Sequence, residues 1–163
     1  MRIYDGAPRQ DWEEVLRCVG AFADREGLKE LLLLEKENGF FLQGLLFMGG
    51  GAAFDNLGSL GKRSYDLSDE RIAEMMDAGH AKRGSGVKGM DREITNYYEL
   101  ALRLIGAFID SQKAHDVFFF EQEGSFVVRL FGTAGSQAGA HTLSEFTREE
   151  MLAMIGDSQQ RRR

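Results

Sequence analysis

Apolar residues recur at spacings of three and four in two segments of this chain, and the second segment begins 86 positions after the first. The first apolar stripe runs from Trp12 to Ala23 and the second from Tyr98 to Ile109. Such spacing places apolar side chains along one face of an α-helix. Each segment is therefore predicted to form an amphipathic helix.

Two short apolar runs follow each predicted helix, and a glycine-containing pair separates them. The pair is Asn38-Gly39 in the first half and Gly124-Ser125 in the second. A short turn of this kind between two apolar runs is typical of a β-hairpin, because its residues tolerate positive φ. We therefore predict hairpin strands at residues 31–35 with 40–47, and at 117–121 with 126–131.

The two halves also agree residue by residue. Residues 12–45 align without a gap on residues 98–131, and ten of the 34 positions are identical. Ordinary composition would give roughly two matches at a single offset. The identical pairs are Glu13/Glu99, Leu16/Leu102, Arg17/Arg103, Gly20/Gly106, Ala21/Ala107, Phe22/Phe108, Asp24/Asp110, Glu35/Glu121, Glu37/Glu123 and Phe40/Phe126.

The likeness resumes where residues 62–68 face residues 141–147, which predicts a third strand in each half. Ser68 and Thr147 then have the chemistry of helix N-caps, so a short helix is predicted after each of them, at 68–78 and at 147–156. The predicted fold class is α+β. It is an internally duplicated helix–hairpin–strand–helix unit (α-β-β-β-α twice), with a mainly antiparallel sheet and pseudo-twofold symmetry.

The predicted units occupy residues 1–79 and 91–157. A basic glycine-rich linker covers 80–90, and a disordered basic tail covers 158–163. Each unit alone is near the lower size limit for a stable core, so we expect both to share one domain. The sequence leaves open whether their strands form one sheet or two.

Composition favours a globular cytoplasmic protein. Hydrophobic residues make up 43% of the chain, and no stretch approaches 18 uncharged apolar residues. The first residues lack the apolar core of a signal peptide, so neither export nor membrane insertion is expected. Cys18 is the only cysteine and is expected to be a buried hydrophobe. A net charge of −6 argues against a surface that is basic throughout and leaves room for a local basic patch.

Two segments approach catalytic or nucleotide-binding motifs without meeting them. Residues 58–64 resemble a phosphate-binding loop, but the loop lacks its first glycine and has Arg63 where Ser or Thr is required. Ser136 lacks the flanking glycines of a nucleophile elbow. His115 and His141 stand where the first half has lysines, which favours solvated basic positions over metal ligands. We expect no catalytic residue, no metal and no cofactor.

Charges that occur in both halves admit structural explanations. Glu13 with Arg17, and their counterparts Glu99 with Arg103, have the four-residue spacing of an ion pair within a helix. Acidic residues flank the first strand of each hairpin. They are interpreted as solvated residues beside apolar strands, with a cation site as the alternative if the hairpin ends meet: Glu35, Glu37, Glu121 and Glu123.

Gly20 and Gly106 lie mid-helix, where glycine costs about 1 kcal/mol relative to alanine. Close approach of another element would compensate for this cost. A ligand passing over the glycine is the alternative.

The basic linker is the best candidate for a ligand-binding site. It carries Lys82, Arg83, Lys88 and Arg92 close to several glycines, whose backbone amides could meet a phosphate. No aromatic residue lies among these charges, which weakens a model of stacking on single-stranded nucleic acid. A plain flexible connector is the favoured interpretation.

The leading hypothesis is a non-catalytic binding or adaptor protein that holds a protein partner on an apolar sheet face or in a groove between the repeats. Large apolar residues at successive strand positions, as in 31–34 and 117–120, would lie on both faces of the sheet, which favours a homodimer or another protein partner. Two alternatives are a nucleic-acid or phosphate-ligand binder acting through the linker, and a small-molecule enzyme with glycine-rich lid loops. Nucleic acid is not favoured and no membrane contact is expected.

Overall fold

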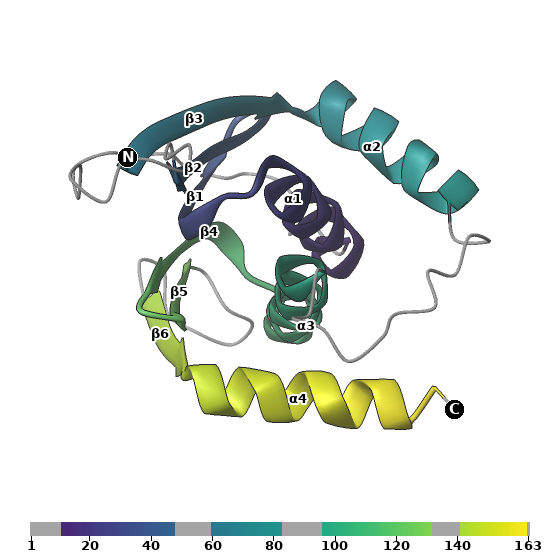
Figure 1. Cartoon of the computed structure of the whole chain (residues 1–163), viewed down its shortest axis with the longest axis vertical. Coiled ribbons are helices and arrows are strands. Elements are labelled where there is room, and N and C mark those ends of the chain that lie inside the picture. The colour runs from purple at the N-terminus through teal and green to yellow at the C-terminus, as the bar shows by residue number, and fades with distance from the viewer. Residues whose placement is uncertain (1–10, 48–59, 83–95, 132–140, 163) are drawn as a thin grey trace, which may run out of the picture.

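The computed structural model describes residues 11–47, 60–82, 96–131 and 141–162. The predicted α+β fold is confirmed, with helices and strands in the predicted order (Figure 1). In the first half the elements are α1 (Trp12–Glu26), β1 (Lys29–Lys36), β2 (Gly39–Phe47), β3 (Leu60–Ser68) and α2 (Asp69–Lys82). In the second half they are α3 (Tyr97–Gln112), β4 (His115–Gln122), β5 (Ser125–Phe131), β6 (His141–Phe146) and α4 (Arg148–Gln160).

All six strands form one antiparallel sheet in the order β3-β2-β1-β4-β5-β6. The sequence left open whether the halves form one sheet or two, and the central pairing of β1 with β4 joins them. Leu33 lies opposite Phe119 at the middle of this pairing. Because β1 and β4 run antiparallel, the two hairpin turns lie at opposite ends of the sheet. The predicted strands at residues 31–47 and 117–131 are confirmed.

The sheet curves around α1 and α3, and all four helices lie on its concave side (Figure 1). The concave side holds the core, because alternate residues of the central strands point toward the two long helices. Leu33, Leu42, Phe119 and Val128 are fully buried there. The helices bury their predicted apolar stripes against this layer, including Trp12, Leu16, Val19, Tyr98, Leu102, Ile105 and Ile109.

Two glycines set the distance between α1 and α3, which run antiparallel. A Cβ atom at Gly20 would lie 2.8 Å from the Cα of Glu99 and closer still to the backbone of Tyr98. A Cβ atom at Gly106 would lie 2.7 Å from the Cα of Glu13. Close approach of the helices, predicted from the two mid-helix glycines, is therefore confirmed.

Each long helix is capped by an aspartate from the other. The carboxylate of Asp110 accepts hydrogen bonds from the backbone N–H groups of Trp12 and Glu13, both at 3.0 Å. The carboxylate of Asp24 accepts from Tyr98 and Glu99 at 3.1 and 2.9 Å. The first N–H groups of a helix have no partner within the helix, so these bonds satisfy them and attach the two helices to each other.

The short helices extend further than the sequence indicated. The N-cap at Thr147 is confirmed, with a complete capping box to Glu150, and Ser68 accepts a hydrogen bond from the backbone of Arg71. α2 continues to Lys82, into the stretch expected to be linker, and α4 continues to Gln160, into the stretch expected to be a disordered tail. A helix can continue as long as its backbone hydrogen bonds form and one of its faces packs against the core. In α4, the buried residues Met151 and Ile155 supply that packing.

Glycine contacts between the long helices predict a sharp difference among alanine variants. Gly20→Ala and Gly106→Ala should each lower the free energy of unfolding by roughly 2–4 kcal/mol, because overpacking against backbone outweighs the gain in helix propensity. Gly156→Ala is the matched control, since no atom lies within 4 Å of its added Cβ. That variant should gain up to about 1 kcal/mol. Urea denaturation measures all three, and equal effects at the three sites would contradict the close contact.

Candidate functional site: the outer face of the sheet

The charged residues that occur in both halves form ion pairs between the halves. This finding corrects their interpretation as ion pairs within each helix. Arg17 donates to Glu99 at 2.9 Å, and Arg103 donates to Glu13 at 2.9 Å. Arg17 is the one charged residue that is buried among those described, and it also binds Glu14 on its own helix at 2.7 Å. The pKa of its guanidinium is raised, first by the bond to Glu14. These contacts explain why the same residue types occur twice.

Glu35 and Glu121 are not solvated hairpin residues, because each binds a backbone N–H of the other half. Glu35 accepts from Val117 at 2.9 Å, and Glu121 accepts from Leu31 at 3.2 Å. Both N–H groups lie where the strand register shifts, in β1 between Lys29 and Leu32 and in β4 between His115 and Phe118. Such bulges leave ladder N–H groups unpaired, and here the carboxylates satisfy them. The alternative of a cation site at the hairpin ends is wrong, since these ends lie apart.

Burial raises the pKa of Glu121 above its ordinary range, although the bonds from Tyr98 and Leu31 act in the opposite direction. The Tyr98 hydroxyl donates to Glu121 at 2.7 Å, and burial, with Glu121 nearby, raises the pKa of that hydroxyl too. Burial likewise raises the pKa of Asp24. These groups form a structural seam between the halves: their hydrogen bonds are used within the fold.

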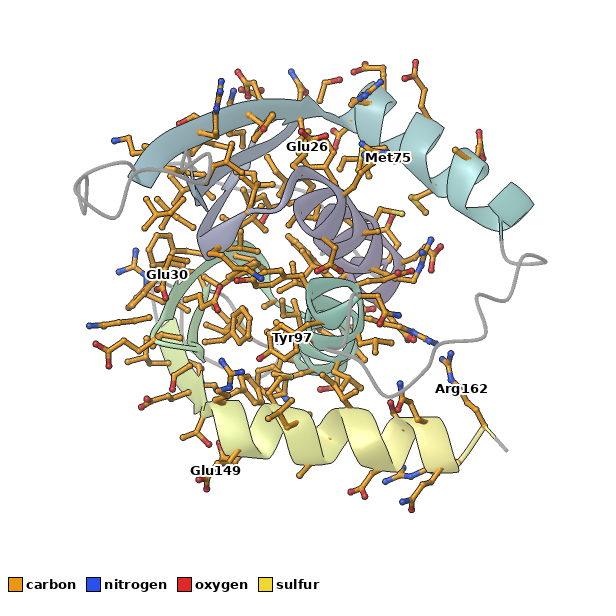
Figure 2. All side chains as sticks on the ribbon, in the orientation of Figure 1. Glu26, Glu30, Met75, Tyr97, Glu149 and Arg162 are labelled. Atoms are coloured by element: carbon orange, nitrogen blue, oxygen red, sulfur yellow. The ribbon has the colours of Figure 1, made fainter. Side chains whose placement is uncertain are left out.

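Cavities lie on the helix side of the sheet, and the largest of the three described has a volume of about 320 Å³. Arg17, Arg103 and Arg162 line it together with Glu99. Figure 2 shows the Arg162 side chain pointing from the end of α4 toward α3. Two of the three guanidinium groups already bind carboxylates, so this cavity offers little net positive charge to an anion.

The sequence-predicted ligand residues fall almost entirely outside the described structure. Lys82 is the last residue of α2, whereas Arg83, Lys88 and Arg92 lie in the segment 83–95, outside the described residues. Cys18 is buried on α1, as expected. Within the described ranges, no three His, Cys, Asp or Glu side chains are grouped closely enough to hold a metal ion.

The convex side of the sheet, which we call the outer face, carries two rows of side chains that run across all six strands. Strand register sets both rows. From β3 to β6, the first row is Asp66, Phe41, Leu34, Phe118, Arg129 and Leu143. The second row is Ser64, Gln43, Leu32, Phe120, Val127 and Glu145.

Apolar side chains concentrate on the two central strands of the outer face. Leu34 is 36% exposed, and its cross-strand neighbour Phe118 is half-buried. The rings of Phe118 and Phe120 lie 5.8 Å apart. Near the edge, Leu143 is 64% exposed. Contiguous apolar area of this kind is uncommon on a protein surface and marks interaction sites.

Arg129 lies over two aromatic rings of this apolar surface. Its guanidinium carbon is 5.2 Å from the ring centre of Phe118 and 4.9 Å from that of Phe131. A guanidinium group over aromatic rings gains a cation–π attraction and can still donate hydrogen bonds. On the opposite half, Lys36 forms an ion pair with Asp66. Arginine and aromatic residues are the residue types enriched at protein interfaces.

The chain matches no protein-family model, no curated protein and no solved structure. Across the described helices, none is long and apolar enough to span a membrane. The choice of a candidate site therefore depends on the geometry alone. Among the features described above, the outer face is the one that the geometry supports best. Sequence reasoning found its apolar strands but not the two rows, because the rows depend on strand order and register across both halves.

The raised pKa of Glu121 predicts a pH-dependent difference between the wild-type protein and Glu121→Gln. The folded state holds this proton above the ordinary carboxyl pKa of 4.5, so the wild-type protein loses stability relative to the variant as pH rises from about 4.5 toward neutrality. Urea denaturation between pH 4.5 and 7.5 measures the difference. Glu149→Gln, on the exposed start of α4, controls for removal of one carboxylate. A wild-type gain over Glu121→Gln with rising pH would contradict the assignment.

Proposed function

We propose that the protein is a non-catalytic binding or adaptor protein that holds a protein partner on its outer face. One observation carries the proposal: seven of the twelve side chains in the two rows are apolar, and the four helices all lie on the other side of the sheet. Exposing that surface costs free energy, so covering it with a partner is favourable.

The two alternative functions have less support. A small-molecule enzyme needs a deep pocket with convergent polar groups, whereas two of the three arginines that line the largest described cavity already bind carboxylates. Binding of phosphate or nucleic acid through the linker rests on residues outside the described structure. A cytoplasmic location stays part of the proposal.

We also infer that the chain is an internal duplication with pseudo-twofold symmetry. Reciprocal contacts support this inference, because several contacts between the halves have a counterpart made by the residues 86 positions away. Asp24 caps α3 while Asp110 caps α1, and Glu35 binds Val117 while Glu121 binds Leu31. Reciprocal contact of identical residues is the pattern of a twofold interface.

Site-specific photo-crosslinking in cells tests the binding function without assuming a partner. A photoreactive amino acid at position 120, on the outer face, should give covalent adducts with protein. The same group at position 77, exposed on α2, is the control and should give few adducts. Adducts of equal yield at both positions, or no adduct at position 120, would refute the proposed function.

A further inference from the structure

On the basis of the proposed binding function, we propose that the outer face binds an amphipathic α-helix of a partner protein. The helix lies along the central strands β1 and β4 and places a carboxylate beside Arg129. The curvature of the face, the spacing of its two rows and the position of this arginine support a partner of that kind.

The curvature of the outer face limits the width of a contact. The face is convex, so a partner touches the two central strands first and meets the edge strands only if it curves around them (Figure 1). Neighbouring strands lie about 4.8 Å apart, so the β1–β4 strip is about 10 Å wide. An α-helix with its side chains has a diameter of about 10–12 Å. One helix therefore covers the strip.

The length of the strip and the spacing of its rows also match a helix. β1 and β4 have eight residues each, so the strip is roughly 26 Å long and has room for about 17 helical residues. Leu34 and Phe118 form one row across the strip, and Leu32 and Phe120 form the next, two residues further along. Two strand residues rise about 6.6 Å, close to the rise of about 6 Å between helix residues i and i+4. Successive turns of an apolar helix stripe therefore meet successive rows.

Two other occupants fit the strip less well. An extended segment laid on the face of the sheet would leave its own backbone N–H and C=O groups without partners, whereas a helix satisfies these groups internally. A second copy of this chain would bring a second convex sheet, and two convex faces touch only along their central strands. Their edge strands would stay apart, so the contact would bury little area for its size.

One positive charge lies beside the strip. Eight positions of the two rows lie on the four inner strands β2, β1, β4 and β5, and six of them are apolar, one is Gln43 and one is Arg129. The acidic residues of the rows, Asp66 and Glu145, lie on the edge strands β3 and β6. The guanidinium carbon of Arg129 is 5.2 Å from the ring centre of Phe118. A partner on the strip therefore meets a cation at one side.

This cation determines which charge the partner carries. Arg129 forms no ion pair within the part of the chain that the structure describes. A partner that covers the strip removes water from the guanidinium group, which is costly unless another acceptor replaces that water. A helix on β1 and β4 holds one flank of its apolar stripe over β5. Asp or Glu on that flank binds Arg129, and Lys or Arg there is repelled.

Selection from a peptide library tests the helix and its charge together. The probe is a displayed library of helical peptides of about 18 residues, randomised along one stripe and on both flanks of that stripe. The whole wild-type chain should enrich peptides with large apolar residues at i, i+3, i+4 and i+7 and with Asp or Glu on one flank. A selection that yields no binders, or binders without an acidic flank, would overturn the proposal.

The variant Arg129→Glu should reverse the charge preference. A selected acidic peptide should bind this variant about tenfold more weakly than it binds the wild type, and the same peptide with Lys on its flank should bind the variant more tightly. Fluorescence anisotropy measures both. Arg161→Glu makes the same change of net charge at an exposed position just after α4, and this control should bind the acidic peptide as the wild type does. Equal losses in the two variants would contradict a contact with Arg129.

A second pair of variants tests where the peptide binds. Leu34→Glu should weaken binding of the selected peptide on the order of 100-fold, since it places a charge in the middle of the strip. Leu152→Glu is the matched control, because Leu152 on α4 is 39% exposed, similar to Leu34, and lies on the helix side. That variant should bind as the wild type does. Circular dichroism checks the fold of each variant, and equal binding by two folded variants would overturn the proposal.

Failure of the helical partner and failure of the binding function give different results. Adducts at position 120 in cells, together with a selection that yields no helical peptide, would refute the helix and leave the binding function intact. Absence of adducts at position 120 would refute both. Sedimentation equilibrium identifies a second copy as the occupant: a species of twice the 18.3 kDa chain mass that Leu34→Glu dissociates would also refute the helix.

Discussion

The close contact of α1 with α3 at Gly20 and Gly106 is the constraint on which the rest of the structure depends. Because each glycine lies against the backbone of the other helix, the N-terminus of one helix comes within hydrogen-bond reach of an aspartate near the C-terminus of the other. The same approach sets β1 beside β4 beneath the helices and so makes one sheet out of two groups of three strands. A single added methyl group at either glycine would push these elements apart.

A seam of polar residues gives the contact between the halves its register. Removal of these groups from water is costly, and the cost is visible in the raised pKa values of Glu121 and Asp24. The fold offsets this desolvation cost because the carboxylates accept hydrogen bonds from backbone N–H groups that have no partner within their own helix or strand ladder. An apolar seam could slide, whereas paired donors and acceptors fit in one arrangement. The halves therefore meet in one defined register.

Local sequence patterns predicted most of the individual elements. Helix periodicity identified α1 and α3, and turn chemistry identified both hairpins, because these signals act over a few neighbouring residues. The partners of charged residues were mispredicted for the opposite reason. Glu13 lies four residues from Arg17 along the helix, yet its partner is Arg103, 90 positions away. Contacts of that kind depend on tertiary packing, and the repeated identities were the only signal in the sequence that pointed to them.

Concentration of all four helices on one side of the sheet connects the fold to the proposed function. The helices bury the concave side, and the convex side keeps its apolar rows as a surface for a partner. This division depends on the seam, because only joined halves align Leu34 with Phe118 and Leu32 with Phe120.

A double-mutant cycle on Arg17 tests the seam most directly. Arg17→Met combined with Glu99→Gln should show a coupling free energy of about 1 kcal/mol, whereas Arg17→Met combined with Glu13→Gln should show none beyond about 0.3 kcal/mol. Coupling of Arg17 with Glu13 and none with Glu99 would contradict the account, because it would mean that the repeated charges act within each helix and not between the halves.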